Sequence, residues 1–467
     1  MTLVTLARGS LGNRRAAVAL TVATIAISIA LLVLVEQMRS QVREGFYRSV
    51  SGTDLIVGAP TSSVQLLLFS VFGLGNPTSN VGWARYREIA DRPVVDWSIP
   101  LSLGDSHQGF RVIGTTAAMF EHYRYAGGRS LEFRHGGPFD GLFDVVVGAR
   151  AADRLGYAIG DRVVLAHGGG NVSLQHHDEL PFVVSGVLAP TGTPVDQSLY
   201  IRLDAHHAIH VGWEQGTPRP GATLSPEQAQ ARAGHGGHDH ARPEHPDRGE
   251  HGDDARGAAE SEARVATPAR DDNEQRRAQA SLQPEQISSF LLGLKTRAAA
   301  LGLRYEINQR REAPLLAILP GIALQELWRI TGLAEQILRV VAGLVVLAGL
   351  LGMLTALLTT LNERRREMAI LRACGARPWQ ISALLLLEAA FIMLSGIAAG
   401  LLLAAAAQFV LAPWLLARFG IAVSLTWPEA WQWLVLSGIA LAGVLVALVP
   451  AAMVYRRTLS DGMQVRQ

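Results

Sequence analysis

The chain has 467 residues, of which 49% are hydrophobic and only 18% are charged, and its formal net charge is +2. Soluble domains carry about 25% charged residues, so this composition favours a membrane protein. The small net charge gives no indication of nucleic-acid binding, and we expect no nucleic acid among the partners. The single cysteine, Cys374, cannot form a disulfide within the chain.

Four apolar stretches are each long enough to cross a bilayer, which takes about 20 residues of helix. We predict four transmembrane helices, over residues 16–35, 340–361, 381–412 and 431–454. The first could also belong to a secretory signal, but it is longer than the apolar part of such signals, so we interpret it as a retained helix. Glu388 is the only charged residue of the third stretch. An intramembrane carboxylate is a functional candidate, although snorkelling to the interface is the simpler interpretation.

Arginine-rich flanks indicate which side of the membrane is cytoplasmic, because Arg and Lys are enriched in cytoplasmic loops. Arginines precede the first stretch, separate the second from the third and follow the fourth, whereas the connection before the fourth contains only Arg418. This pattern predicts that both termini are cytoplasmic. The predicted cytoplasmic parts are residues 1–15, 362–380 and 455–467, and the predicted external parts are residues 36–339 and 413–430.

The external segment of residues 36–339 carries strand signals, such as the β-branched runs DLIVG and DVVVG, mixed with helical patterns. We therefore expect a large α+β extracytoplasmic domain, inserted between the first and second membrane helices. Within it, residues 282–307 favour a strand, a helix and a second strand.

At both ends of this external domain, apolar residues recur at helical spacing. They are Leu34, Met38, Val42 and Phe46 after the first membrane stretch, and Leu327, Ile330, Ala334 and Ile337 before the second. We predict two amphipathic helices that pair as a stalk. The alternative is that each helix only covers the core of the external domain.

Residues 214–281 contain almost no large apolar side chain, so they cannot bury enough surface to offset the loss of chain entropy. We expect a disordered insertion there. Its imidazoles alternate with carboxylates, a combination that suits zinc, copper or nickel. The candidate metal ligands are His235, His238, Asp239, His240, His245 and His251. The alternative is a polar linker without metal, and we expect no other directly bound cofactor.

A second group of histidines, His206, His207 and His210, precedes the insertion. His206 and His210 would share one face if this segment were a helix. Because the surrounding pattern indicates no definite element, we interpret the group as part of a solvated loop.

The cytoplasmic segment between the second and third membrane helices reads NERRREMAILRACGARPWQ. We predict a helix over residues 362–377, with Gly375 as its terminator and Pro378 in the first turn of the next helix. Positive charge alone would serve only to anchor this segment. The small residues Ala373, Gly375 and Ala376 in addition permit close approach by another protein.

The stretch RRREMAILRACGARPWQISALLLLEA closely resembles the cytoplasmic loop and following helix of the FtsX-like permease domain. That domain belongs to the MacB/LolC/FtsX superfamily of ABC-transporter permeases. The tail PAAMVYRRTLSDGMQVR, the first apolar stretch and the external segment VVVGARAADRLGYAIGDRVVLAHGG resemble the same family. The resemblance covers the chain except the His-rich insertion.

The resemblance implies the permease subunit of an ABC transporter, a multi-pass protein of the bacterial plasma (inner) membrane. Such permeases pair with a second permease copy, as a homodimer or heterodimer, and sit on a dimer of cytoplasmic ABC ATPase subunits. They transmit ATP-driven movement to the external domain, a process called mechanotransmission. The external domain then acts on an envelope substrate, which would be a lipoprotein, a peptide, a lipid or a metal-linked component.

The resemblance also assigns roles to residues. ATP would be bound by the partner subunit, because this chain lacks the Gly-x4-Gly-Lys-Ser/Thr phosphate loop, so we expect no enzyme activity of its own. The implied ATPase-coupling residues are Arg366, Glu367, Ala369, Leu371, Arg372, Gly375 and Ala376.

Two alternatives to transport stay open. The same machine could activate an external cell-wall enzyme, a periplasmic partner, without moving a substrate. The chain could also be an envelope metal-binding protein linked to zinc homeostasis, with its helices as anchors in the lipid bilayer. A simple anchor, however, needs no close-contact surface at Gly375 and Ala376.

Overall fold

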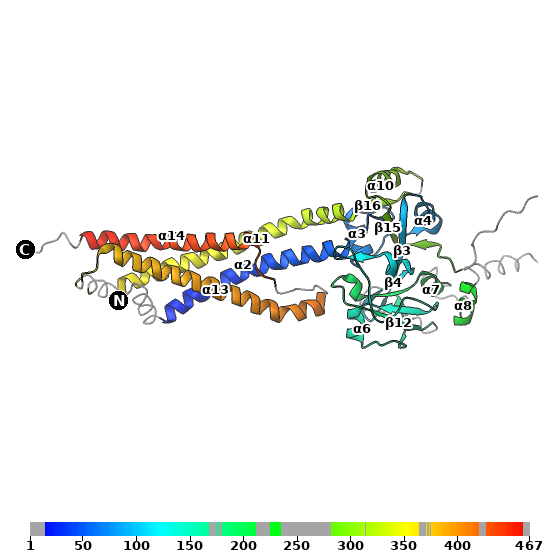
Figure 1. Cartoon of the computed structure of the whole chain (residues 1–467), viewed down its shortest axis with the longest axis horizontal. Coiled ribbons are helices and arrows are strands. Elements are labelled where there is room, and N and C mark those ends of the chain that lie inside the picture. The colour runs from blue at the N-terminus through cyan, green and yellow to red at the C-terminus, as the bar shows by residue number, and fades with distance from the viewer. Residues whose placement is uncertain are drawn as a thin grey trace, which may run out of the picture. The chain divides into compact units, whose positions relative to one another are not determined.

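The computed structural model describes residues 15–167, 175–176, 180–211, 225–234, 282–312, 314–363, 370, 373, 375–419 and 426–460 (Figure 1). These residues form two compact units. The helical unit comprises the described residues up to Tyr47 and from Gln325 onward, and the sheet unit comprises those from Arg48 to Leu324. The chain passes between the units within two long helices.

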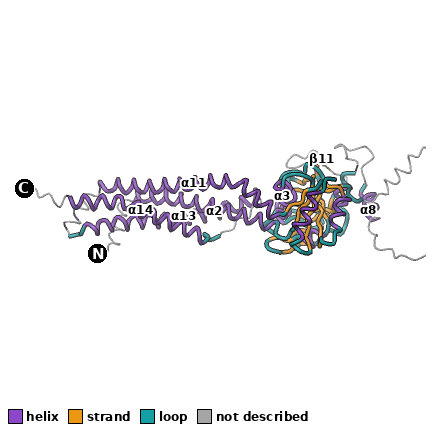
Figure 2. The backbone as a smooth tube through the Cα atoms, turned by 90° about the horizontal axis from the view of Figure 1, so that it is seen from above, coloured by secondary structure: helices purple, strands orange, loops and turns teal. Residues whose placement is uncertain are grey.

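Four helices in the helical unit are long and apolar enough to cross a membrane, which confirms the four predicted membrane helices. They are α2 (Arg15–Ser49), α11 (Pro320–Glu363), α13 (Pro378–Phe419) and α14 (Ala430–Ser460), and they lie side by side in Figure 2. α2 has 35 residues and α11 has 44. At 1.5 Å per residue they are about 52 and about 66 Å long, so both exceed a hydrocarbon core of roughly 30 Å.

Apolar side chains from all four helices form the core of the bundle. They are Ile25, Ile29, Ala30, Val33, Met353, Leu357, Ala389, Ile392, Met393, Ile397, Ala404, Leu436 and Ala447. Two glycines of α13, Gly396 and Gly400, face Ile25 and Ile29 of α2, and a Cβ on either glycine would come within 2.5 and 2.7 Å of these side chains. Small residues at this spacing let two helix backbones approach closely, which is how helices pack inside a membrane.

Helices α2 and α11 pair through an aromatic contact and an ion pair. The rings of Phe46 and Trp328 meet edge to face with centroids 5.5 Å apart. The Arg39 guanidinium binds the Glu335 carboxylate at 3.4 Å. Trp328 and Glu335 are seven residues apart, so they lie on the same face of α11.

This pairing uses a different face of α11 from the one that the apolar pattern indicated. Ile330 and Ile337 are 65% and 57% exposed within the chain. Among the apolar residues on which the stalk prediction rested, Ile330 and Ile337 therefore lie away from the contact with α2. The reason is that an apolar stripe on a long helix can face lipid or another chain instead of its own partner helix.

The sheet unit is built on a mixed sheet, as the α+β prediction required. Its strand order in the described residues is β16-β1-β15-β3-β4-β13-β8-β12-β7. The β13–β4 and β12–β8 pairs are parallel, and the other pairs along this path are antiparallel.

The strands are β1 (Leu55–Gly58), β2 (Val81–Gly82), β3 (Val95–His107), β4 (Phe110–Thr115), β5 (Arg124–Tyr125), β6 (Arg129–Ser130), β7 (Phe133–Gly136), β8 (Asp144–Val147), β9 (Arg162–Val163), β10 (Ala166–His167), β11 (Gln175–His176), β12 (Phe182–Leu188), β13 (Ser198–Arg202), β14 (Gln286–Ile287), β15 (Ser289–Leu294) and β16 (Leu316–Ile318). The helices are α3 (Ser63–Val71), α4 (Trp83–Ala90), α5 (Ala118–His122), α6 (Ala149–Leu155), the 3-10 helix η1 (Pro194–Gln197), α7 (Leu203–Ala208), α8 (Pro226–Gly234) and α10 (Ala299–Gln309).

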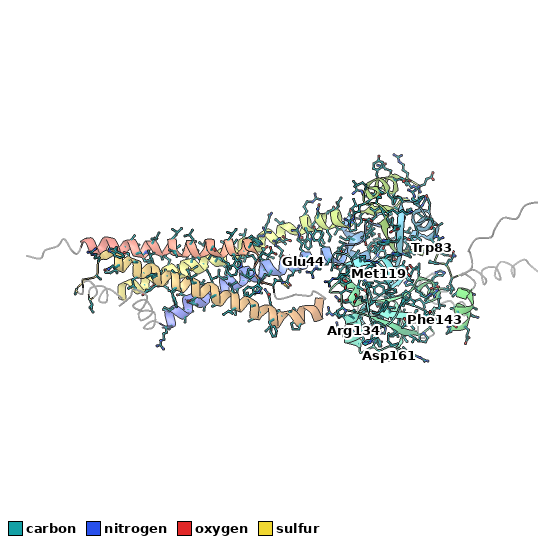
Figure 3. All side chains as sticks on the ribbon, viewed as in Figure 1. Glu44, Trp83, Met119, Arg134, Phe143 and Asp161 are labelled. Carbon is teal, nitrogen blue, oxygen red and sulfur yellow. The ribbon has the colours of Figure 1, made fainter. Side chains whose placement is uncertain are left out.

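Two groups of buried side chains hold the sheet unit together. One contains Phe182 and the other contains Phe290. Phe143 packs on the first group, with its ring centroid 5.5 Å from that of Phe182, and Trp83 packs on the second (Figure 3). The sheet unit therefore has two hydrophobic cores, formed by different parts of the chain.

The end of the segment of residues 282–307, which was predicted to form a second strand, belongs to helix α10 instead. Ala300, Leu303 and Ile307 of this helix are buried in one of the two cores. Their spacing of three and four residues places them on one helical face. Burial of this face favours a helix more strongly than the β-branched and aromatic residues of the segment favour a strand.

Part of the predicted disordered insertion is folded. Residues 226–234 form α8, and Ala229 is fully buried. Ser225 caps this helix: the Gln228 N–H donates to the Ser225 Oγ at 3.3 Å, and the Ser225 N–H donates to the Gln228 Oε1 at 3.0 Å. This reciprocal pair is a capping box, followed by Pro226 at the first helical position, and it stabilises the helix despite the polar composition.

Candidate functional site

The turn before α13 is the described part of the predicted coupling segment. Gly375 has a φ of +92°, a left-handed conformation that favours glycine and suits the predicted helix terminator. Helix α13 begins at Pro378, as predicted, and the Arg377 N–H donates to the Gln380 Oε1 at 2.8 Å. Ala376 packs against a cluster formed by Ile381, Leu385 and Val454. The turn is thus fixed to both α13 and α14.

Apolar side chains beside this turn are exposed. Ile370 is 58% exposed and Trp379 is 55% exposed. Together with Ala373, which is also exposed, they offer an apolar surface next to Gly375. The other implied coupling residues lie outside the described part of the chain: Arg366, Glu367, Ala369, Leu371 and Arg372.

Buried polar side chains connect the helices of the helical unit. Gln408 of α13 donates through Nε2 to Gln37 of α2, and Gln37 donates through its own Nε2 to the Thr426 carbonyl oxygen at 3.1 Å. Glu36 and Arg39 line a cavity of about 400 Å³ near this network. The bond between Gln408 and Gln37 joins α13 to α2, and the bond to Thr426 joins α2 to the segment just before α14. Hydrogen bonds between helices fix their register where water is scarce.

Glu388 is only 4% exposed. Its side chain is therefore enclosed by the helix bundle. Glu388 lies one residue before Ala389, which is part of the bundle core. An enclosed carboxylate of this kind adds to the polar groups that specify how the helices pack.

The sheet unit contains an open cavity of about 430 Å³. Its lining includes Trp83, Phe139, Arg202, Asp204 and Arg232. Arg202 binds Asp204 with both arms of its guanidinium, Nε to Oδ1 at 3.0 Å and the terminal nitrogen to Oδ2 at 2.7 Å. The wall of this cavity thus combines aromatic side chains with an ion pair.

Asp105, His206 and His210 come together in the sheet unit. Asp105 is on β3, His206 is on α7 and His210 lies in the turn after it. The His206 Nε2 is 3.2 Å from the Asp105 Oδ2, and the His210 Nε2 is 3.5 Å from the Asp105 Oδ1. The interpretation of residues 206–210 as a solvated loop was therefore wrong, because α7 buries His206 to 8% exposure.

Charge explains how His210 ionises in this cluster. Burial by itself lowers the pKa of His210. Asp105 raises the pKa through a hydrogen bond and its negative charge, and the hydrogen bond to the His206 carbonyl raises it further. These effects outweigh the effect of burial, so the pKa of His210 lies above its usual value.

Sequence reasoning missed Asp105 and assigned metal binding elsewhere. The candidate ligands His235, His238, Asp239, His240, His245 and His251 all lie outside the described residues. The i, i+4 spacing of His206 and His210 was a signal that the two side chains lie on one side of a helical turn. Helix α7 itself ends at Ala208, and His210 lies in the turn after it. No sequence signal connects Asp105 to these histidines.

Models of two protein families match parts of the chain. The model of the FtsX-like permease C-terminal domain matches residues 339–460, and the model of the MacB-like periplasmic core domain matches residues 18–233. No protein with a curated description matches the chain.

Among solved structures, the chain is similar to the crystal structure of the extracellular domain of the noncanonic ABC-type transporter YknZ from Gram-positive bacteria. That match has 8% identity and a TM-score of 0.27, and it covers 56% of this chain and 98% of that one. Values this low do not establish a common fold. The two family models, with the four helices of membrane-spanning length, show that the chain belongs to the MacB/LolC/FtsX family of ABC-type permeases.

Proposed function

We propose that this permease couples ATP hydrolysis by a separate cytoplasmic ATPase to movement of the sheet unit. The observation that carries the proposal is the turn at Gly375 and Ala376. Ala376 packs on Ile381 and Leu385 of α13 and on Val454 of α14. A partner that pushes on this turn would therefore move two membrane helices together. The family assignment supports the same conclusion, because ABC-type permeases work with ATPase subunits.

Helices α2 and α11 would carry the movement across the membrane as a stalk. Each is one continuous helix that contains residues of both units. The two helices are held together by the contact of Phe46 with Trp328 and by the ion pair of Arg39 with Glu335. They would therefore move as a pair rather than as two separate helices. In this proposal both termini and residues 362–380 face the cytoplasm of a bacterium, and the sheet unit faces the envelope.

The work done by the sheet unit would be extraction or expulsion of an envelope substrate, of the lipoprotein, peptide, lipid or metal-linked class. The functional complex would contain two permease copies on an ATPase dimer. The chain itself would hydrolyse no ATP. Activation of a periplasmic cell-wall enzyme is the second candidate function, because the same movement of the sheet unit would serve it. Zinc on the His-rich insertion belongs to the proposal as a loosely bound metal.

The first test is identification of the partner. The full-length chain is purified from crosslinked native membranes, and the co-purifying proteins are identified by mass spectrometry. A stoichiometric ABC ATPase is the expected result. An external enzyme recovered with it would favour the regulatory function, whereas recovery without any ATPase would contradict the coupling proposal.

The second test places the contact surface. Ile370→Glu puts a charge on the exposed apolar surface beside Gly375, and Leu301→Glu makes the same change at a 60% exposed residue of α10. With the co-purified ATPase in lipid nanodiscs, we expect Ile370→Glu to lower coupled ATPase activity at least about 10-fold, equivalent to roughly 1.4 kcal/mol of contact energy. Leu301→Glu should leave it unchanged. Equal activity of the two variants would show that the ATPase contacts another surface.

A further inference from the structure

A β-bulge places Asp105 on the face of the sheet that carries α7. Along the β3–β4 pair, Leu103 lies opposite Ile113, but Asp105 lies opposite Val112, so two residues of β3 advance against one of β4. Side chains alternate faces along a regular strand, and an extra residue reverses this alternation. Asp105 thus shares a face with Val112 and Gly114 rather than with Leu103.

The same face receives His206 at close range. A Cβ on Gly114 would lie 2.7 Å from the Cβ and 2.8 Å from the Cγ of His206. Only glycine therefore allows α7 to approach β4 so closely. The contact fixes the base of the His206 side chain, and its Nε2 lies 3.2 Å from the Asp105 Oδ2.

His210 is oriented by a hydrogen bond of its own. Its Nδ1 lies 2.6 Å from the His206 carbonyl oxygen. A carbonyl oxygen only accepts, so Nδ1 carries the proton and donates it. In neutral His210 the lone pair is then on Nε2, which faces Asp105. Histidines that bind metals usually donate their second ring N–H to a carbonyl or carboxylate in this way.

The distances match those between ligands of one metal ion. Two ligands at about 2.0–2.1 Å from a tetrahedral zinc ion are about 3.3 Å apart. The His206 Nε2 is 3.2 Å from the Asp105 Oδ2 and the His210 Nε2 is 3.5 Å from the Asp105 Oδ1, so each imidazole faces a different oxygen of the carboxylate. One ligand atom from each of the three residues lies within 4.8 Å of the other two. A tetrahedral ion would draw these three ligand atoms together to about 3.3 Å from one another.

Burial fits a site that opens on one side. The Asp105 side chain is 0% exposed and that of His206 is 10% exposed, whereas that of His210 is 25% exposed. A buried carboxylate needs compensating positive charge. The exposed side of His210 gives a metal ion access from solvent.

We propose that Asp105, His206 and His210 form a binding site for a divalent transition metal ion of the zinc class. One carboxylate oxygen and two imidazole Nε2 atoms supply three ligands, and a fourth position is left for water or a ligand from outside the chain. Two nitrogen ligands with one carboxylate favour zinc over magnesium and calcium, which prefer oxygen ligands. This site goes beyond the coupling proposal, because it needs neither the ATPase nor the stalk.

The test must separate this site from the His-rich insertion. The full-length chain is purified in detergent as a background variant, in which His235, His238, His240, His245 and His251 are replaced by Ser and Asp239 by Asn. Zinc binding is measured by isothermal titration, and cobalt is used as a spectroscopic substitute. We expect one equivalent of zinc per chain and the visible absorption of four-coordinate cobalt.

Variants in this background identify the ligands. His210→Ala should weaken zinc binding by at least about 100-fold, since loss of a mere outer-shell partner already costs 10–100-fold. His207→Ala is the matched control, because His207 is the neighbouring histidine of α7 outside the cluster, and it should keep full affinity. Zinc should also raise the Tm of the background and His207→Ala proteins but not that of His210→Ala.

The result that overturns the site is equally clear. Failure of the folded background variant to bind one equivalent of zinc would leave the cluster as a hydrogen-bonded group without metal. Equal zinc affinity of His210→Ala and His207→Ala would do the same. If His210→Ala failed to fold, Asp105→Asn, which keeps the shape of the side chain, should show the same loss of zinc binding.

Discussion

Gly400 of α13 lies so close to Ile29 of α2 that a Cβ on Gly400 would be 2.7 Å from the Ile29 Cβ and 2.8 Å from the Ala26 carbonyl oxygen. A backbone oxygen cannot rotate away as a flexible side chain can. Any larger residue at 400 must therefore push the two helices apart. The contact makes Gly400 one of the positions that set the distance between α2 and α13.

Gly400→Leu should destabilise the helical unit. Overpacking costs about 1–3 kcal/mol where the surroundings can adjust, and rigid backbone on the other side places this site at the upper end. Gly438→Leu in α14 is the matched control, because nothing lies within 4 Å of a Cβ there. Thermal unfolding in detergent, followed by tryptophan fluorescence, measures both. An equal Tm for the two variants would contradict close packing at Gly400.

Two glycines of the sheet unit should respond to alanine in opposite directions. A Cβ on Gly293 of β15 would lie 2.1 Å from the Trp97 indole ring, whereas a Cβ on Gly302 of α10 meets nothing within 4 Å. Gly293→Ala should therefore cost about 1–3 kcal/mol. Gly302→Ala should stabilise by up to about 1 kcal/mol, since alanine favours a helix. Chemical denaturation of the full-length chain measures the free energy of unfolding of both variants. Destabilisation by Gly302→Ala would contradict the open surroundings of Gly302.

The four membrane helices were predictable because long apolar runs leave few alternatives. The helical extensions of α2 and α11 beyond the membrane were also indicated, by apolar residues at helical spacing from Leu34 to Phe46 and from Leu327 to Ile337. The face by which α11 pairs with α2 escaped prediction. The sequence pattern identified the apolar stripe with Ile330, but Trp328 and Glu335 face α2.

The Asp105 cluster could be predicted only in part. The i, i+4 spacing of His206 and His210 gave their common face, but α7 has only six residues, too few for a clear apolar period. Asp105 is brought to them by a β-bulge, and the position of a bulge depends on strand register, which local sequence does not determine. The helix at residues 226–234, by contrast, was predictable from local sequence. Its capping box of Ser225 and Gln228 is a pattern that can be read in the sequence, although the polar composition of the segment led to a prediction of disorder.

Asp196 should stabilise the loop of residues 191–197. Its carboxylate accepts hydrogen bonds from the Thr191 N–H, the Thr191 hydroxyl and the Gly192 N–H, each at 2.8 Å. Asp196→Ala leaves these donors without their acceptor, which should cost about 1–3 kcal/mol. Asp196→Asn keeps one acceptor oxygen and should cost less. Chemical denaturation compares the two, and equal losses would show that the hydrogen bonds contribute little.

Asp196 should also make stability depend on pH. Burial raises the pKa of Asp196 and its hydrogen bonds lower it, and the net result is a raised pKa. The folded state then holds the proton to higher pH than the unfolded state, so stability falls as pH rises from the unfolded to the folded pKa. Relative to Asp196→Asn, the unchanged chain should gain stability as pH is lowered through this window. A constant difference across the window would contradict the raised pKa.

The contact between Phe46 and Trp328 should stabilise the α2–α11 pair directly. Their rings meet edge to face with centroids 5.5 Å apart, and such aromatic pairs contribute about 0.5–1.5 kcal/mol beyond the area that they bury. A double-mutant cycle of Phe46→Ala and Trp328→Ala measures this coupling by thermal unfolding. The control is a second cycle, in which Phe46→Ala is combined with Ile330→Ala instead of Trp328→Ala. Ile330 is 65% exposed on another face of α11.

We expect coupling of about 1 kcal/mol for the first cycle and none for the control. If α2 and α11 also transmit movement, Trp328→Ala should reduce coupled ATPase activity in nanodiscs while Ile330→Ala leaves it unchanged. A coupling energy without any change in ATPase activity would confirm the contact and contradict the stalk. Loss of ATPase activity in both variants would show that α11 tolerates no shortened side chain in this region, whichever way it faces, so the effect would not come from its pairing with α2.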